Sequence, residues 1–144
     1  AMGQNQFMPS SFLRFAVDYN GDGRRNIWTD RADVFASTAN YLARVGWRHD
    51  QTWGRRVLIP ALLDAKLLGL KVKKTMQEWQ KMGVRRADGS DLPRRKLSAS
   101  LIRPKAGDDE IFLVYDNYRA ILRWNRAHLF ATAVGTLADR IGDG

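Results

Sequence analysis

The sequence contains no cysteine, only two histidines and only two glutamates. Without cysteine, disulfide bonds, thiolate chemistry and cysteine-ligated zinc are excluded. The histidines, His49 and His128, lie in separate segments, so we expect neither a histidine-based metal site nor a catalytic triad. The glutamates, Glu78 and Glu110, stand in a helix-capping pattern and in an acidic turn. Neither context buries a carboxyl group in the way that proton-donating catalysis requires.

Long hydrophobic runs are absent as well. The longest, such as residues 67–70, are far shorter than the roughly 20 residues of a transmembrane helix. Hydrophobic residues nevertheless make up 44% of the chain and include five tryptophans, which is typical of a globular protein. A length of 144 residues predicts one domain with a real core.

Positive charge is in excess, with 24 Lys and Arg against 15 Asp and Glu and a net charge of +9. This excess favours an anionic partner: nucleic acid, an acidic membrane surface or an acidic polymer. The basic residues form short clusters at 71–74, 85–86 and 94–96, without a recognition helix or an aromatic–basic RNA motif. We interpret them as a solvated basic surface, and nucleic-acid binding stays open as an alternative.

Local signals predict helices in the first half of the chain. A hydroxyl next to Pro9 predicts the start of a short helix. Asp33 is predicted to cap a second helix, which Gly46 ends. Residues 47–56 are predicted as a loop, and residues 60–69 as a third helix that opens with proline.

The second half contains a capping box, two strands and a helical end. Thr75 and Glu78 form the capping box of a short helix. Residues 97–102 and 110–115 are β-prone and predict a hairpin. Helical periodicity from residue 121 predicts terminal helices that stop at Gly142. The chain is therefore predicted to be mainly α (α+β), with a small β-hairpin before the terminal helices.

The stretch DYNGDGRRNIWTD, residues 18–30, opens like a calcium-binding loop. Asp18, Asn20 and Asp22 occupy positions one, three and five, and a glycine follows at six. Position twelve, where a helix–loop–helix site has a bidentate Glu, is Thr29. A polar turn without an ion is therefore the alternative to a calcium site.

Four segments in order resemble lytic murein transglycosylases of the membrane-bound transglycosylase B type. AMGQNQFMPSS, residues 1–11, resembles the family's GAMGxxQFMPSS segment. Residues 18–28 resemble its DxxGDGxxNLW loop, and residues 33–41 are similar to its DAIGSVANY helix. Residues 114–125 resemble the terminal segment that ends in an aromatic–Asn pair. Together these matches extend over nearly the whole chain.

The resemblance implies a lysozyme-like fold and the peptidoglycan glycan strand as partner. Enzymes of this family cleave the β-1,4 bond between N-acetylmuramic acid and N-acetylglucosamine, and the product ends in 1,6-anhydromuramic acid. One Glu acts first as acid and then as base, and it lies upstream of the GAMG segment. Residues 1–144 are thus expected to be the C-terminal part of the catalytic domain, inactive alone. A signal or membrane anchor would also lie upstream, and the expected location is the periplasm of a Gram-negative bacterium.

The resemblance also assigns residues that bind substrate. Gln6, Tyr41, Trp124 and Asn125 match family residues that line the cleft. Aromatic faces suit the C–H faces of a sugar ring, and amides suit its hydroxyl and acetamido groups. Judged by spacing alone, Tyr41, Trp124 and Asn125 would be core or structural residues, and Gln6 would be a helix-entry residue that satisfies the backbone.

For calcium, the resemblance adds a closing carboxylate to the opening half of the loop. Asp18, Asn20 and Asp22 would supply side-chain oxygens, Arg24 its backbone carbonyl, and Asp33, at position sixteen, the closing carboxylate. The rival to the enzyme is a non-catalytic peptidoglycan-binding or scaffold module. The resemblance gives no reason to expect a nucleic-acid partner.

Overall fold

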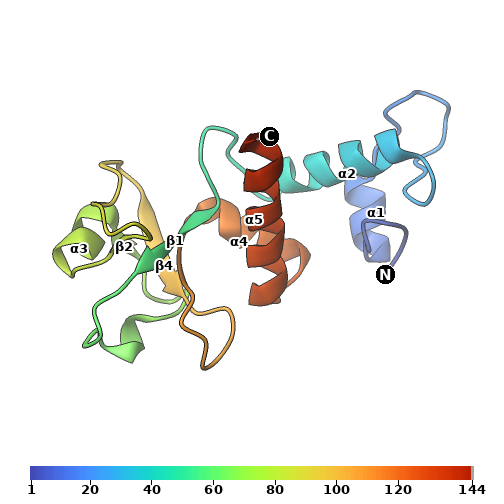
Figure 1. Ribbon diagram of the computed structural model, residues 1–144. Coiled ribbons are helices and arrows are strands. Elements are labelled where there is room, and N and C mark those ends of the chain that lie inside the picture. Colours follow the sequence, from blue (N-terminus) through green and yellow to red (C-terminus); the bar gives the residue numbers. More distant parts are fainter. Residues whose placement is uncertain (144) are drawn as a thin grey trace. The chain divides into compact units, whose positions relative to one another are not determined.

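The computed structural model describes residues 1–143, and the chain divides into two compact units, Ala1–Arg48 and His49–Gly144 (Figure 1). No helix among the described residues combines the length and the apolar character that crossing a membrane requires. The length of the chain predicts a single domain, so the division into two units is a feature that the sequence did not indicate.

The first unit contains helices α1, Pro9–Phe15, and α2, Arg31–Arg44. The residue before α1 is Met8, which forms no capping bond, so the predicted hydroxyl cap is wrong. Pro9 suits the start because its fixed φ matches the helix and its missing N–H would have no helical partner. The cap of α2 is Asp30, and the prediction that Asp33 caps this helix is also wrong.

Aromatic side chains form the core of the first unit. Tyr41 packs against Phe7 at a ring-centroid distance of 5.7 Å and edge-on against Phe15 at 4.9 Å. Ile27 is fully buried. Gly3 lies so close to it that a Cβ there would be 2.5 Å from Cγ1 of Ile27, which explains why this position has no side chain.

The second unit is built on a five-stranded antiparallel sheet in the order β2-β4-β5-β1-β3. The predicted hairpin is confirmed as β4 and β5, in register at Leu101 and Leu113. The strands are β1 (Gly54–Leu58), β2 (Lys74–Thr75), β3 (Arg85–Arg86), β4 (Ser98–Ile102) and β5 (Ile111–Val114).

Strand β1 begins within the predicted loop at residues 47–56, which corrects that prediction. Its Arg55 and Arg56 are not buried, and these charged residues interrupt the apolar pattern that predicts a strand. The predicted helix at 60–69 is absent too, and only the 3₁₀ turn η1, Ala65–Leu67, forms there. Leu62 is 98% exposed, so the leucines of this stretch do not share one buried face.

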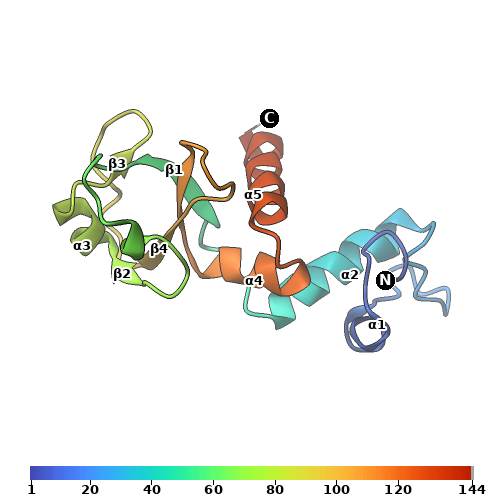
Figure 2. The ribbon, with the colours of Figure 1, turned by 90° about the horizontal axis from the view of Figure 1, so that it is seen from below.

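Helix α3, Met76–Lys81, lies beside β2 at the edge of the sheet (Figure 2). The predicted capping box is confirmed, because Thr75 Oγ1 accepts from the Glu78 amide at 3.2 Å and the Glu78 carboxylate accepts from the Thr75 amide at 3.4 Å. The helix carries Trp79, which is fully buried and donates its indole N–H to the Ala99 carbonyl at 2.9 Å. Helix α3 therefore closes one end of an apolar core.

Helices α4, Asp116–Trp124, and α5, His128–Asp143, confirm the predicted helical end of the chain. Helix α5 continues past Gly142, so this glycine does not stop it. Trp53 is buried against α5 and donates its indole N–H to Asp139 at 3.0 Å. A Cβ on Gly135 would lie 2.4 Å from the Trp53 ring, so only glycine permits this close packing.

Candidate functional site

Three carboxylates converge in the loop between α1 and α2. Oxygens of Asp18, Asp22 and Asp33 all lie within 4.8 Å of one another. Asp33 is fully buried, Asp18 is half-buried and Asp22 is exposed. Among residues 1–143 none of the three forms an ion pair with a basic side chain. Their negative charges therefore lie close together without a basic partner among the described residues.

Backbone amides hold these carboxylates in place. Asp18 accepts from the Gly21 and Gly23 amides, each at 2.8 Å. Asp33 accepts from the amides of Tyr19 and Asn26, also at 2.8 Å each. The loop thus folds around the side chains of its two ends, and Gly21 and Gly23 have the positive φ that such winding requires.

The other predicted ligands lie at the same loop. Asn20 accepts from the Asp22 amide at 3.2 Å and donates to Asp30 at 2.6 Å. The Arg24 amide donates to Asp22 at 2.8 Å. Asp30, which caps α2, was not predicted as part of this cluster, although its position three residues before Asp33 is a capping pattern.

The donor set fits calcium. Every side chain that converges here offers oxygen, and hard divalent cations such as Ca²⁺ prefer carboxylate and carbonyl oxygens. Each carboxylate oxygen has two lone pairs. Oδ1 of Asp18 accepts from two amides, but Oδ2 of Asp18 and both oxygens of Asp33 accept from one amide each and keep a lone pair for an ion. Asp18, Asp22 and Asp33 are the residues that would hold it.

Gln6 is exposed on a tight turn of the first unit. Met2 and Phe7 exchange two backbone hydrogen bonds, of 2.7 and 3.0 Å, around this turn. Among the described residues, Gln6 is the one non-glycine with positive φ, at 55°. Its Nε2 donates to the Gly3 carbonyl at 2.8 Å, and its Oε1 has no partner within residues 1–143. This acceptor is therefore open to a ligand.

Tyr41 lies inside the aromatic core of the same unit. It is 6% exposed and packs on Phe7, the residue that follows Gln6. Tyr41 is thus a core residue, as its spacing suggested, and its role in substrate binding remains a prediction. Gln6 and Tyr41 belong to the first unit, while Trp124 and Asn125 belong to the second, so a common wall of all four also remains a prediction.

Trp124 and Asn125 form the junction between α4 and α5. Trp124 is half-buried, and its ring meets Phe130 edge-on at 5.9 Å. Asn125 is exposed, and its Oδ1 accepts from the Ala127 amide at 2.9 Å. Its Nδ2 has no partner within the described part of the chain, so it offers one free donor.

An open hollow of about 540 Å³ adjoins this junction, and sequence reasoning did not identify it. Arginines at 119, 123 and 126 recur at helical spacing, which is the signal that could have revealed it. Arg119 is fixed by bonds to the Leu70 carbonyl at 2.7 Å and to Ser100 at 3.1 Å. The lining residues are Leu70, Arg119, Leu122, Arg123, Arg126 and His128.

Behind His128 lies a buried tyrosine. Tyr118 stacks on the His128 ring, and its hydroxyl shares a 2.7 Å hydrogen bond with Nδ1 of that histidine. Burial raises the pKa of Tyr118 well above its ordinary range, so its hydroxyl stays protonated at neutral pH. This contact fixes the imidazole at the rim of the hollow.

The architecture is that of a lysozyme-like transglycosylase. Residues 1–139 match the transglycosylase SLT domain family, and the chain belongs to this family. The resemblance drawn from the QFMPSS segment and the aspartate loop is thereby confirmed.

Three relatives illustrate the match. Membrane-bound lytic murein transglycosylase B of Escherichia coli K12 is 33% identical over 148 residues, covering 98% of this chain and 38% of its own length. SltB3 of Pseudomonas aeruginosa, solved with NAG-anhNAM-pentapeptide, is 46% identical with a TM-score of 0.92, over 100% of this chain and 39% of that one. Slt35 of E. coli, solved with calcium, is 30% identical with a TM-score of 0.79, over 99% and 44%. The chain spans about two fifths of the length of these relatives.

Proposed function

We propose that this chain is part of a peptidoglycan lytic transglycosylase that cleaves the β-1,4 bond between N-acetylmuramic acid and N-acetylglucosamine and forms the 1,6-anhydro product. The observation that carries the proposal is the match along the whole chain to SltB3, which was solved with NAG-anhNAM-pentapeptide. Family membership over residues 1–139 supports it independently. The glycan strand is the partner, and the periplasm is the proposed location.

Gln6, Tyr41, Trp124 and Asn125 are proposed to form the substrate wall. The open Oε1 of Gln6 can accept from a sugar hydroxyl or acetamido N–H, and the open Nδ2 of Asn125 can donate to a sugar oxygen. The half-buried Trp124 ring offers an aromatic face to a pyranose, held by its contact with Phe130. Tyr41 supports the turn that carries Gln6 through its packing on Phe7.

The acid/base Glu is proposed to come from outside residues 1–144, so that this chain is the C-terminal part of the catalytic domain. Glu78 belongs to the capping box of α3 with its side chain 54% exposed, and Glu110 pairs with Arg56 with its side chain 46% exposed. A carboxyl group that must stay protonated to act as acid needs an apolar pocket, which neither residue has. Lacking that group, the isolated chain is expected to be inactive.

A cleavage assay tests whether the acid/base Glu lies outside residues 1–144. Purified chain is incubated with murein sacculi, and the release of anhydromuropeptides is measured. We expect none, because acid–base catalysis contributes about 10²–10⁴-fold and more where it is the only chemical group. Release of anhydromuropeptides that is abolished by mutating a residue within 1–144 would contradict this assignment.

A binding assay tests the wall. Asn125→Asp keeps the oxygen that accepts from the Ala127 amide but replaces the free Nδ2 donor. Asn125→Ala loses both. If the donor contacts the glycan, both variants weaken binding of peptide-free glycan fragments by a comparable factor, of roughly 2- to 13-fold for one hydrogen bond. Binding retained by Asn125→Asp would reduce Asn125 to a capping residue.

The second candidate is a non-catalytic peptidoglycan-binding or scaffold module. The placement of both glutamates favours it, since neither suits proton transfer. The two proposals separate when the chain is joined in trans or in one polypeptide to a segment that supplies the missing Glu helix. Cleavage by the joined protein supports the enzyme, and binding without cleavage supports the module.

Calcium is proposed as a structural ion of the first unit. The convergence of Asp18, Asp22 and Asp33 supports this role, and Slt35 was solved in complex with calcium. The ion would offset most of the charge of the three carboxylates and would take no part in bond cleavage.

A further inference from the structure

Residues 94–96, Arg-Arg-Lys, form a basic triplet on a loop of the second unit that is anchored at both ends. Leu92 is 5% exposed, and its amide donates to the Gln80 side chain at 2.8 Å. Leu97 packs against the core, and its carbonyl accepts from the Met76 amide at 3.1 Å. The flanking leucines thus hold the loop inward while all three cations stay exposed.

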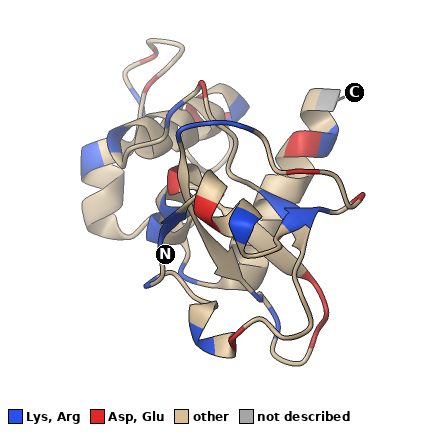
Figure 3. Cartoon of the chain, turned by 90° about the vertical axis from the view of Figure 1, so that its left-hand side faces the viewer, with Lys and Arg blue, Asp and Glu red and all other residues tan. Residues whose placement is uncertain are grey.

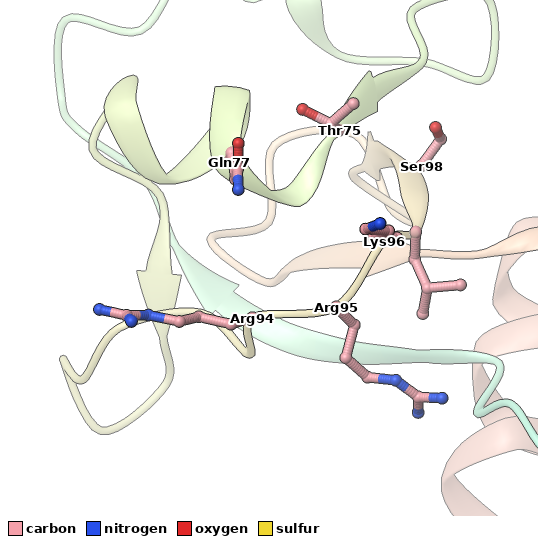
Figure 4. A pocket seen from close by; sticks show the side chains of 7 residues that line it. Thr75, Gln77, Arg94, Arg95, Lys96 and Ser98 are labelled. Atoms are coloured by element: carbon pink, nitrogen blue, oxygen red, sulfur yellow. The ribbon is translucent and has the colours of Figure 1, made fainter.

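The triplet lines an open hollow of about 460 Å³ beside α3 (Figure 4). Paired residues of β2 and β4, Thr75 and Ser98, line it as well, together with Gln77 of α3 and Leu97. No acidic side chain is among its lining residues. The charged side chains around the hollow are therefore all positive, although most of its lining surface is apolar.

A second hollow of about 410 Å³ adjoins the first. The two share Gln77 and Arg94, and the second follows α3 toward Lys81 and Asp91. A six-residue helix such as α3 is roughly 9 Å long, at about 1.5 Å per residue. An extended peptide of about three residues spans the same distance. The two neighbouring hollows together therefore extend over about the length of a short peptide.

The three cations of the triplet have no acidic partner among the residues that the structure describes. Three other basic side chains of this unit, Lys73, Lys74 and Arg85, pair with Asp116, Glu78 and Asp91. The triplet makes no ion pair within residues 1–143. Charged positions elsewhere mix both signs along the chain (Figure 3).

The direction of the side chains limits what they can bind. Figure 4 shows the Arg94 and Arg95 side chains leaving the loop in different directions. They do not converge on one point, so a single compact anion would meet only one of them. An extended ligand with negative charges spaced along it would meet both.

We propose that this hollow binds the peptide stem of peptidoglycan through its carboxylates, an inference that rests on the proposed function. The sugars of the strand carry no free charge once the peptide is attached, so a basic triplet has its counterpart in the peptide. The stem is extended, bears carboxylates along its length, and has amide groups that match the side chains of Gln77 and Ser98. Neither of these side chains has a hydrogen-bond partner within the described residues.

Nucleic acid is the other polyanion that a basic hollow could take. Proteins that bind single strands combine basic grooves with aromatic platforms on which bases stack. The lining of this hollow contains Thr, Gln, Arg, Lys, Leu and Ser and no aromatic ring. The observations therefore favour the peptide.

The first experiment uses the peptide without its sugars. The 144-residue chain is titrated with a synthetic pentapeptide stem with free carboxylates, and with the same peptide carrying carboxamides, while amide NMR shifts are followed. We expect shifts at Gln77 and Ser98 with the carboxylate peptide and at least tenfold weaker binding of the carboxamide. Equal binding of the two peptides, or shifts confined to other surfaces, would overturn the inference.

A charge-matched pair of variants locates the effect. The variant R94Q/R95Q/K96Q should bind the carboxylate peptide about tenfold more weakly, since each exposed charge pair contributes roughly a factor of two. The control R103Q/K105Q/R140Q removes the same charge from exposed positions elsewhere in this unit. An equal loss in both variants would mean general charge attraction and would overturn the site. Thermal melting of both variants checks that each is folded.

A further comparison separates this inference from the proposed function. Glycan strands with their peptides and strands stripped of peptide are offered to the parent chain and to the triplet variant. We expect the variant to lose affinity only for the strands that keep their peptides. Peptide binding without any glycan binding would sink the proposed function and leave the hollow in place. A short oligonucleotide that binds the triplet more tightly than the peptide would assign the hollow to nucleic acid and overturn the inference.

Discussion

The two units of the chain are stabilised by different means. In the first, the buried carboxylate of Asp33 organises the loop by accepting hydrogen bonds from two backbone amides. In the second, a sheet and α3 enclose an apolar core around Trp79, whose single polar atom is satisfied by a backbone carbonyl. The stability of the first unit should therefore respond to ions and to loss of charge, and that of the second to loss of apolar volume.

The largest effect is expected from Trp79→Ala. Removing a fully buried indole should lower the free energy of unfolding of the second unit by about 3–5 kcal/mol, because it leaves a large cavity. Amide hydrogen exchange at Leu113 for the second unit and at Ile27 for the first would measure the two separately. Trp79→Phe should cost less. Equal loss of protection at both reporters would contradict the comparison.

Asp33→Ala should have the next largest effect, in the first unit. It leaves the amides of Tyr19 and Asn26 without their acceptor in two part-buried hydrogen bonds, and each loss should cost about 1–2 kcal/mol, the lower part of the range for a buried amide without a partner. The expected loss is about 2–4 kcal/mol at Ile27, with Leu113 unchanged. Asp33→Asn, which keeps an acceptor oxygen, is the matched control. A cost below 1 kcal/mol for Asp33→Ala would show that the loop does not depend on this carboxylate.

Calcium should produce a smaller change, again in the first unit. At ten times its dissociation constant, an ion that binds only the folded state adds about 1.4 kcal/mol. Melting in millimolar calcium and in chelator should therefore differ for the parent, while Asp22→Ala should abolish most of the difference. An identical midpoint in both conditions, for parent and variant alike, would remove the proposed ion.

The smallest effect concerns an exposed carboxylate of the second unit. Asp88 accepts from the Ser90 hydroxyl at 2.5 Å and from its amide at 2.9 Å, and these bonds lower the pKa of Asp88 below 3.8. A lowered folded-state pKa gives stability that is present above the unfolded value and is lost as the pH falls through the folded value. NMR titration of Asp88 should show this lowered pKa, and Ser90→Ala should raise it toward 3.8. No difference between parent and variant would mean that the hydroxyl does not set it.

Features with local signals could be predicted from the sequence. The capping box at Thr75, the hairpin of β4 and β5 and the terminal helices depend on neighbouring residues, and all three are confirmed. Strand β1 was missed because it is defined by its partners β5 and β3, while its own arginines are not buried. The helix expected at 60–69 fails for the opposite reason, since its leucines are numerous but do not share a buried face.

The candidate site divides in the same way. The resemblance predicted the carboxylate cluster, and the structure brings Asp18, Asp22 and Asp33 together. Asp30, and not Asp33, caps α2. The buried carboxylate of Asp33 instead accepts hydrogen bonds from amides inside the loop. The hollow beside α3 could not be predicted, since Thr75, Gln77 and the triplet meet only through the pairing of β2 with β4.

The position of Asp33 has a consequence for the order of folding. The two carboxylate oxygens of Asp33 accept from the amides of residues 14 and 7 positions earlier in the chain. Because Asp33 lies in the first turn of α2, we expect the loop to close only when that turn has formed. Closing a loop of this length takes on the order of 10–100 ns, far faster than assembling a five-stranded sheet from distant strands. We therefore expect loop ordering and helix nucleation to occur together, through short-range contacts that form before the sheet of the second unit is complete.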